Sequence, residues 1–238
     1  MDIYEILEKI RRHPGLYLKA ENLTHLNLFI DGYRLGLQET KHVNERLYPL
    51  PFEMFTSYCA VKYHETRSIG YERMLLEECS QNQKRALWRF FEVLDEFKEN
   101  VRITECEVCD LTEENIRFHL TNRYVVKTGI YQDGNWTGKP AYSGVGRMYH
   151  ISFSYGADLL IPISDCEHVR GGLFYCPDRE KHSHFHGFEN MEEHVERCFG
   201  NTVWRRLELN EEQQLSLLND YFYGSGKTTE EFGAEEWQ

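Results

Sequence analysis

The spacing of apolar residues changes near Asn100, and this change constrains the fold more than any other feature of the sequence. Before Asn100, apolar residues recur every three or four positions, as they do on one face of a helix. After it, short runs rich in β-branched and aromatic residues alternate with glycine-rich segments, which is typical of strands and turns. Helices followed by strands and a final helix predict an α+β fold, in which the N-terminal helical part packs on a mainly antiparallel sheet.

Four helices are expected in the first eighty residues. The first carries apolar residues at helical spacing: Ile3, Ile6, Leu7 and Ile10. It is broken by the sequence His13-Pro14-Gly15. Thr24 suits the N-cap of the second helix, Pro51 suits the first turn of the third, and a shorter fourth is expected near residues 71–79.

The run SQNQKRALWRFFEVLDEF is the strongest helix signal in the chain. Ser80 and Gln83 predict a capping box at its start. Its apolar residues fall on one stripe: Leu87, Phe91, Leu94 and Phe97. This aromatic-rich helix is therefore predicted to belong to the core.

Five segments after Asn100 are predicted to be strands: VRITEC, IRFHLTN, RYVVKTG, RMYHISFSYG and DLLIPIS. A last helix is expected at about residues 211–223, with Asn210 as its cap and Gly224 as its stop. No Pro/Gly/Ser-rich spacer separates the helical part, 1–100, from the β-rich part, 101–200. We therefore expect residues 1–223 to form a single α+β domain and residues 224–238 to form a flexible acidic tail.

The formal charge of −12 is spread unevenly along the chain. From Leu207 to Gln238 eight acidic residues face Lys227 alone, which gives −7 and leaves −5 for the first 206 residues. An acidic C-terminal end repels nucleic acid and attracts basic proteins. The charge thus favours a basic protein partner over a nucleic acid.

The N-terminal stretch MDIYEILEKIRRHPG has charges every few residues and no apolar run of the signal-peptide type. No stretch of the chain is apolar for long enough to cross a bilayer. The seven cysteines are odd in number and irregularly spaced, which favours reduced thiols over a disulfide framework. We expect a cytoplasmic protein without a membrane partner.

The segment GSGKTT, Gly224 to Thr229, is similar to a phosphate-binding loop but does not meet its requirements. Tyr221 stands where the first glycine of that motif should be. The segment also follows a predicted helix, whereas a P-loop follows a strand. A flexible linker to the acidic tail is the better interpretation.

Eight potential zinc ligands lie within the 33 residues from Cys166 to Cys198: Cys166, His168, Cys176, His182, His184, His186, His194 and Cys198. The histidines of HSHFH alternate and would share one face of a strand, while His194 and Cys198 are one helical turn apart. A zinc site built from Cys176, His182, His184, His186, His194 and Cys198 is one hypothesis. An exposed polar loop with packed histidines is the other.

The pair Cys106-x-x-Cys109 is a weaker signal for redox chemistry. A thioredoxin-like pair opens a helix after a strand, whereas the turn-like sequence DLTEEN follows Cys109.

The segment IRRHPGLYL, Ile10 to Leu18, is similar to IRKRPGMYIG of gyrase-type ATPases. In that family the next helix carries a catalytic Glu and a magnesium-binding Asn. In this chain Leu28 or Phe29 stands at the Glu position and Gly32 stands near the Asn position. Without a carboxylate to activate water or an amide to hold the metal, ATPase chemistry is excluded.

Residues 1–97 resemble a group of small bacterial cytoplasmic proteins in which an RPGMYLG-like turn precedes a Gly-Tyr helix and an FFELLDEF-like helix. The matching segments are IRRHPGLYL, FIDGYRLGL, YCAVKYH, IGYERMLLEE and ALWRFFEVLDEF. His13 replaces the Arg of that pattern and Lys19 replaces its Gly. Such proteins accompany polymorphic toxin systems, so the resemblance implies an immunity role and a cognate toxin as partner.

The leading hypothesis is thus a non-catalytic protein, without a cofactor, that binds a basic toxin domain, such as a nuclease, through an acidic, aromatic surface. Candidate contacts on the glycine-rich loop are Tyr131, Asp133 and Trp136. Candidate contacts on the tail are Glu230, Glu231, Glu235, Glu236 and Trp237. The alternative is a zinc-binding module or zinc-dependent enzyme that uses the Cys166–Cys198 region. The sequence leaves the oligomeric state open.

Overall fold

The computed structural model describes residues 2–40, 50–65, 67, 69–122, 130–132, 135–137, 146–164, 173–175 and 191–223. Its residue contacts fall into two compact units. The helical unit comprises Met1–Arg102 together with the C-terminal segment from Leu209, and the sheet unit comprises Ile103–Glu208. The single α+β domain expected for residues 1–223 stays a prediction, because the structure defines the fold within each unit and not their arrangement.

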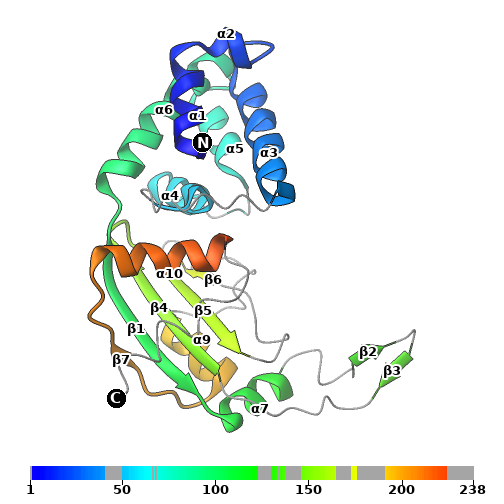
Figure 1. Cartoon of the computed structure of the whole chain (residues 1–238), viewed down its shortest axis with the longest axis vertical. Coiled ribbons are helices and arrows are strands. Elements are labelled where there is room, and N and C mark those ends of the chain that lie inside the picture. Colours follow the sequence, from blue (N-terminus) through cyan, green and yellow to red (C-terminus); the bar gives the residue numbers. More distant parts are fainter. Residues whose placement is uncertain are drawn as a thin grey trace. The chain divides into compact units, whose positions relative to one another are not determined.

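The helical unit (Figure 1) confirms the predicted run of helices before residue 100. Its elements are α1 (Ile3–Arg12), α2 (Pro14–Tyr17), α3 (Leu23–Thr40), the 3-10 helix η1 (Phe52–Met54), α4 (Phe55–Lys62), α5 (Tyr71–Glu78), α6 (Gln83–Asn100) and, after the sheet, α10 (Glu211–Tyr223). No helix among the described residues has the length and apolar character needed to span a membrane.

Aromatic rings form the centre of the helical unit. Phe55 of α4 lies 5.3 Å from the ring centroids of both Tyr71 of α5 and Phe90 of α6, and 5.7 Å from that of Phe97. These edge-to-face contacts add to the burial of apolar area, which is worth about 1.5–3 kcal/mol for a side chain such as Phe. The prediction that α6 supplies core residues is confirmed.

The N-cap of α3 differs from the prediction. The side chain of Asn22, not Thr24, accepts a hydrogen bond from the main-chain N–H of His25, at 2.8 Å. Thr24 lies inside the helix, where its hydroxyl donates to Glu72 of α5 at 2.7 Å. Both residues are good caps by type, and a tertiary contact takes Thr24 away from that role.

The predicted capping box of Ser80 and Gln83 is wrong as well. Ser80 and Gln81 adopt positive φ angles of 52° and 65°. The chain therefore turns before α6, and Asn82 accepts the capping hydrogen bond from the N–H of Arg85 at 3.0 Å. The side chain of Gln83 instead donates to the hydroxyl of Thr24 at 3.0 Å.

The sheet unit contains a five-stranded sheet in the order β6-β5-β4-β1-β7, with every neighbouring pair antiparallel. The strands are β1 (Ile103–Leu111), β4 (Gly146–Phe153), β5 (Asp158–Ser164), β6 (Leu173–Tyr175) and β7 (Arg205–Arg206). A separate two-stranded ladder joins β2 (Ile130–Gln132) to β3 (Asn135–Thr137). The α+β class with a mainly antiparallel sheet is confirmed.

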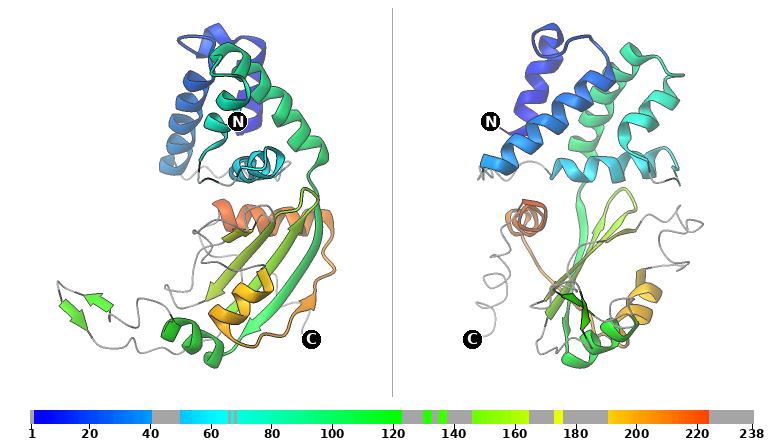
Figure 2. Two further views of the ribbon diagram at one scale, coloured as in Figure 1. Left: turned by 180° about the vertical axis from the view of Figure 1, so that it is seen from behind. Right: turned by 90° about the vertical axis from the view of Figure 1, so that its right-hand side faces the viewer.

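Two helices of the sheet unit, α7 (Glu113–Asn122) and α9 (Met191–Phe199), supply part of its core, and Figure 2 shows α9 lying along the sheet. The cluster consists of Cys109, Leu111, Ile116, Met148, Leu160, Val195 and Phe199, with Cys198 and Trp204 packed against it. The core thus lies between one face of β1, β4 and β5 and the two helices.

The segment IRFHLTN, predicted as a strand, lies within α7 instead. Thr112 starts this helix, because its main-chain oxygen accepts from the N–H of Ile116 at 3.1 Å and its hydroxyl accepts from the N–H of Asn115 at 3.2 Å. Glu113 and Glu114 also stabilise the N-terminal end of a helix dipole. All seven residues of the predicted strand RYVVKTG, 123–129, lie outside the described part of the chain.

The C-terminal helix is confirmed with its predicted cap. Asn210 and Gln213 form a reciprocal pair, in which the Asn210 side chain accepts from the N–H of Gln213 at 2.9 Å and the Gln213 side chain accepts from the N–H of Asn210 at 3.0 Å. The predicted stop at Gly224 and the predicted flexible tail, residues 224–238, lie outside the described residues.

Candidate functional site

Three neighbouring strands place polar side chains on the face of the sheet that also carries the apolar core. Side chains alternate along a strand, so His150 and Ser152 share the face of Met148 on β4. Glu107 of β1 pairs in register with His150, and Asp158 of β5 pairs with Ser152. Glu107, His150, Ser152 and Asp158 therefore meet on one face, and we call them the His150 cluster.

His150 is held from both sides of its ring. Its Nδ1 lies 3.0 Å from Glu107 Oε2 and its Nε2 lies 3.0 Å from Asp158 Oδ1. The hydroxyl of Ser152 donates to Asp158 Oδ1 at 2.7 Å. The ring of Trp204 contacts that of His150 edge to face, with 6.0 Å between the ring centroids.

The pKa values of His150 and Asp158 shift in opposite directions, and both shifts favour the charged form of the group. Burial is the largest single effect and lowers the pKa of His150. The hydrogen bonds to Asp158 and Glu107 and the charges of these two residues together raise the pKa by more, so the net change is upward from 6.5. Burial is the largest single effect on Asp158 and raises its pKa. The hydrogen bonds from His150 and Ser152 and the charge of His150 together lower the pKa by more, so the net change is downward from 3.8. Both shifts favour an imidazolium facing a carboxylate.

This geometry does not suit nucleophilic catalysis. A serine nucleophile needs a neutral imidazole nitrogen to take its proton. Ser152 Oγ does lie 3.2 Å from His150 Nε2, but its hydroxyl donates to Asp158 Oδ1 at 2.7 Å, and the same carboxylate oxygen lies 3.0 Å from Nε2 and favours the charged ring. In the described part of the chain, no group of three or more His, Cys, Asp or Glu side chains is arranged to hold a metal ion. The His150 cluster therefore acts as a polar tie within the sheet.

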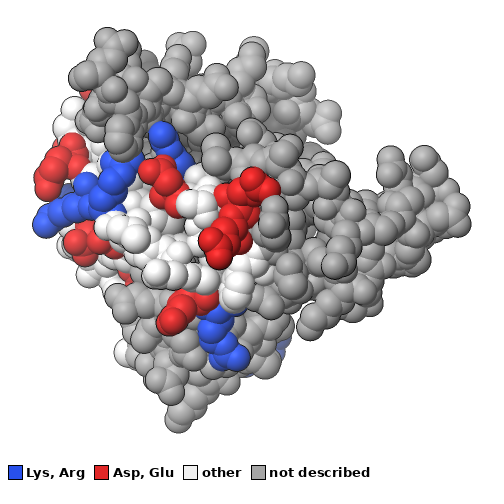
Figure 3. All heavy atoms as spheres, turned by 90° about the horizontal axis from the view of Figure 1, so that it is seen from below, with Lys and Arg blue, Asp and Glu red and all other residues white. Residues whose placement is uncertain are grey.

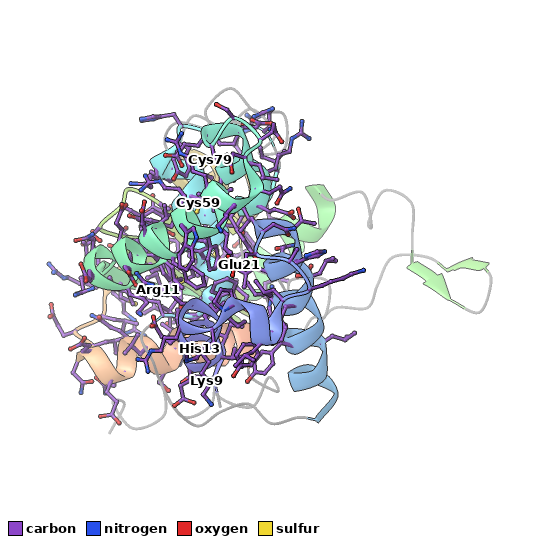
Figure 4. All side chains as sticks on the ribbon, turned by 90° about the horizontal axis from the view of Figure 1, so that it is seen from above. Lys9, Arg11, His13, Glu21, Cys59 and Cys79 are labelled. Atoms are coloured by element: carbon purple, nitrogen blue, oxygen red, sulfur yellow. The ribbon has the colours of Figure 1, made fainter. Side chains whose placement is uncertain are left out.

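The cysteine pair of β1 is not arranged for a disulfide. Cys106 and Cys109 are three residues apart on one strand, so their side chains point to opposite faces of the sheet. Both are buried, and burial, aided by a neighbouring carboxylate, raises the pKa of each thiol to about 12. Cys59 and Cys79 of the helical unit (Figure 4) are buried free thiols too. A thiolate nucleophile at Cys106 or Cys109 is thus disfavoured.

The zinc candidates are only partly described. Cys198 and His194 lie one turn apart on α9, and Cys198 packs against the apolar core of the sheet unit. Cys176, His182, His184 and His186 lie outside the described residues. The structure thus gives Cys198 a packing contact, and the zinc site stays a hypothesis.

The predicted partner contacts are also only partly described. Tyr131 of β2 and Trp136 of β3 are register partners across the two-stranded ladder. Asp133 and the tail candidates Glu230, Glu231, Glu235, Glu236 and Trp237 lie outside the described residues. The ladder brings the two aromatic positions together, and their role in binding stays a prediction.

A different surface, which the sequence analysis did not single out, carries exposed apolar side chains on α2 and α3. Leu16, Leu28 and Leu35 are 79%, 62% and 59% exposed, and Tyr17 is 36% exposed. We call these four residues the α2–α3 surface. Leu28 and Leu35 are seven residues apart, so they share one face of α3, and the Tyr17 ring joins α2 to α3 by packing against Phe29 with 6.2 Å between centroids.

The sequence held a signal for the α2–α3 surface. Leu23, Leu26 and Ile30 form the buried stripe of α3, and Leu28 and Leu35 fall off that stripe. Other large apolar side chains are exposed singly, at Trp88, Phe118 and Val203, which is normal for a folded protein. Four on two connected helices are less usual and make the α2–α3 surface a candidate site of interaction.

The charge of the described surface is mixed. On the face shown in Figure 3, acidic and basic side chains stand side by side. In the first 102 residues of the sequence 16 acidic residues are nearly balanced by 15 basic ones. Many of these are paired, as in the 2.7 Å contact of Arg11 (Figure 4) with Asp95. The acidic excess of the chain therefore lies after residue 102.

The chain matches no protein-family model, no curated protein and no solved structure.

Proposed function

We propose that this chain is a non-catalytic, cytoplasmic protein that binds a cognate protein and neutralises it, in the manner of a bacterial immunity protein. The observation that carries the proposal is the α2–α3 surface, with Leu28 and Leu35 largely exposed on one face of a helix. The resemblance of residues 1–97 to proteins that accompany toxin systems supports the same function and indicates a toxin domain as the partner.

The α2–α3 surface has the composition of an interface core. Apolar and aromatic side chains that lose contact with water on binding supply most of the affinity of a protein complex. Leu16, Leu28 and Leu35 would each gain from such burial, because most of their surface meets water in the free chain. Tyr17 adds an aromatic ring already positioned by Phe29, so little of its freedom is lost on binding.

The acidic excess contributes to binding in a second way, through electrostatic attraction that acts at longer range than apolar contact. The last 32 residues carry a formal charge of −7. A net negative charge accelerates encounter with a basic partner and excludes acidic ones. A nuclease domain is such a partner, because its substrate-binding cleft must be basic to hold nucleic acid. Steering by the acidic end and burial at the α2–α3 surface are thus separable contributions.

Affinity capture from the source organism tests this function. The baits are the full chain, the double variant Leu28→Asp/Leu35→Asp, and Val203→Asp as a matched control at a position that is 81% exposed. We expect one basic protein to be retained by the wild type and by Val203→Asp, and to bind the double variant at least about tenfold more weakly. Made alone, the captured protein should slow growth, and co-expression of the wild-type chain should restore it.

Two results would contradict the proposal. Equal capture by the wild type and the double variant would remove the α2–α3 surface from the interface. A captured protein that does not affect growth would remove the neutralising role. Circular dichroism of all three baits verifies that the substitutions leave the fold intact.

A further inference from the structure

We propose that the His150 cluster is a proton-held latch that adds to the stability of the β1, β4 and β5 ladder in neutral and mildly acidic solution and loses this contribution as the solution becomes alkaline. This regulatory feature is independent of the partner surface. It follows from the position of one buried histidine between two carboxylates from two different strands.

The two carboxylate contacts of the ring are both hydrogen bonds only when the ring carries two protons. A neutral imidazole has one N–H donor and one bare acceptor nitrogen, whereas an imidazolium donates from both nitrogens. Both nitrogens of His150 lie 3.0 Å from a carboxylate oxygen, and a carboxylate cannot donate. After loss of one proton, a lone pair of the ring would face a carboxylate in a site where the His150 side chain is only 9% exposed. The hydroxyl of Ser152, 3.2 Å from Nε2, could turn to donate to that nitrogen, but Asp158 would then lose the hydrogen bonds from both Ser152 and His150. The arrangement is therefore most stable while the ring is charged.

The other charged groups near the cluster have partners of their own. On the edge strand β7, Arg206 pairs in register with Glu107, but its guanidinium lies 3.4 Å from Glu208. Arg147 of β4 points to the opposite face and contacts Asp110 at 3.2 Å. Arg206 and Arg147 are thus each paired with a carboxylate outside the His150 cluster.

The remaining neighbours come from β1 itself and from the helix that covers this face. Glu105 is exposed and pairs in register with Ser152, and the thiol of Cys109 is buried in the core. On α9, Glu196 is exposed, Cys198 packs on the core and Arg197 is exposed. Asp158 and Glu107 are thus the groups that hold the charge on His150.

The direction of the pH effect follows from linkage. His150 has a raised pKa in the folded chain, so its contribution to stability is fully present below the unfolded value of 6.5 and is lost as the pH rises through the folded value. Asp158 has a lowered pKa, so its contribution is present above the unfolded value of 3.8 and is lost as the pH falls through the folded value. The latch therefore contributes to stability between the folded pKa values of Asp158 and His150, and above the folded pKa of His150 it is lost through deprotonation of the ring.

A pH titration of the full chain by NMR, followed at the His150 ring carbon and assigned with His150→Gln, tests the latch. We expect His150 to titrate above 6.5, and we expect Glu107→Gln to lower that value, because it removes one of the two charges that hold the proton. His13→Gln, at an exposed histidine (Figure 4), is the matched control and should leave the titration of His150 unchanged. A value at or below 6.5 in the wild type would overturn the latch.

Urea unfolding of the same proteins at pH 6 and pH 8.5 gives a second readout. The wild type and His13→Gln should unfold at lower urea at pH 8.5 than at pH 6, and this difference should shrink in Glu107→Gln and His150→Gln. If the variants show the same pH dependence as the wild type, the latch is wrong. Should His150→Gln fail to fold, Glu107→Gln carries the comparison alone, because the ring and its other partner remain.

Discussion

The side-chain amide of Asn115, on α7, donates hydrogen bonds to the main-chain oxygens of Phe199 and Asn201, each at 2.9 Å. The carbonyl of the same side chain accepts from the N–H and the hydroxyl of Thr112, at 3.0 and 2.7 Å. One buried amide thus ties the start of α7 to the end of α9, and these two helices pack over the core of the sheet unit.

Replacing Asn115 should therefore destabilise the sheet unit. Asn115→Ala leaves the carbonyl oxygen of Phe199 without this partner in a buried contact and removes the hydrogen bond to the N–H of Thr112, a loss of about 1–3 kcal/mol in the free energy of unfolding. Urea denaturation measures the change. Glu196→Ala, at an exposed position on α9, is the control and should differ from the wild type by less than about 0.5 kcal/mol. Equal stability of Asn115→Ala and Glu196→Ala would show that the tie is unimportant.

Two aromatic residues on α6 should respond very differently to truncation. Phe90 is fully buried against Phe55 and Tyr71, whereas Trp88 is 39% exposed. We expect Phe90→Ala to lower the free energy of unfolding by about 3–5 kcal/mol and Trp88→Ala to lower it by clearly less. Thermal unfolding of both variants makes the comparison, and a larger effect of Trp88→Ala would place the core on the wrong face of α6.

Two glycines should give effects of opposite sign when changed to alanine. Gly32 lies inside α3, and a Cβ there would meet nothing within 4 Å, so Gly32→Ala should stabilise the helical unit by up to about 1 kcal/mol. Gly156 adopts a φ of +85° in the turn between β4 and β5, where an L side chain is strained, so Gly156→Ala should destabilise the sheet unit by about 1–2 kcal/mol. Denaturant unfolding distinguishes them, and a shared sign would contradict the backbone assignment.

The sequence was informative where local patterns decide the structure. The apolar spacing of Ile3, Ile6, Leu7 and Ile10 predicted α1, and the Asn210 cap predicted the start of α10. It failed where tertiary contacts override local preference, as at Thr24, which binds Glu72, and at Ser80, which adopts a positive φ. The residues IRFHLTN have strand-like composition, but the turn at Thr112 and two glutamates start a helix there.

The His150 cluster could not be predicted from the sequence, because its members are 43 and 8 residues apart from His150 and meet only through strand register. A shift of one residue in either pairing would send Glu107 or Asp158 to the opposite face. The α2–α3 surface was more accessible to prediction. Leu28 and Leu35 lie off the buried stripe of α3, and that position alone marks them as exposed.

Hydrogen exchange of the full chain, alone and with the captured partner, is the most direct test of binding through the α2–α3 surface. Binding removes the contacted surface from solvent and slows the opening of the elements beneath it, so it slows the exchange of their amides. We predict slower exchange in α2 and α3, residues 14–36, in the presence of the partner, and no such change with the Leu28→Asp/Leu35→Asp variant. Slower exchange confined to the sheet unit, with α2 and α3 unchanged, would contradict the claim that this chain binds its partner through the α2–α3 surface.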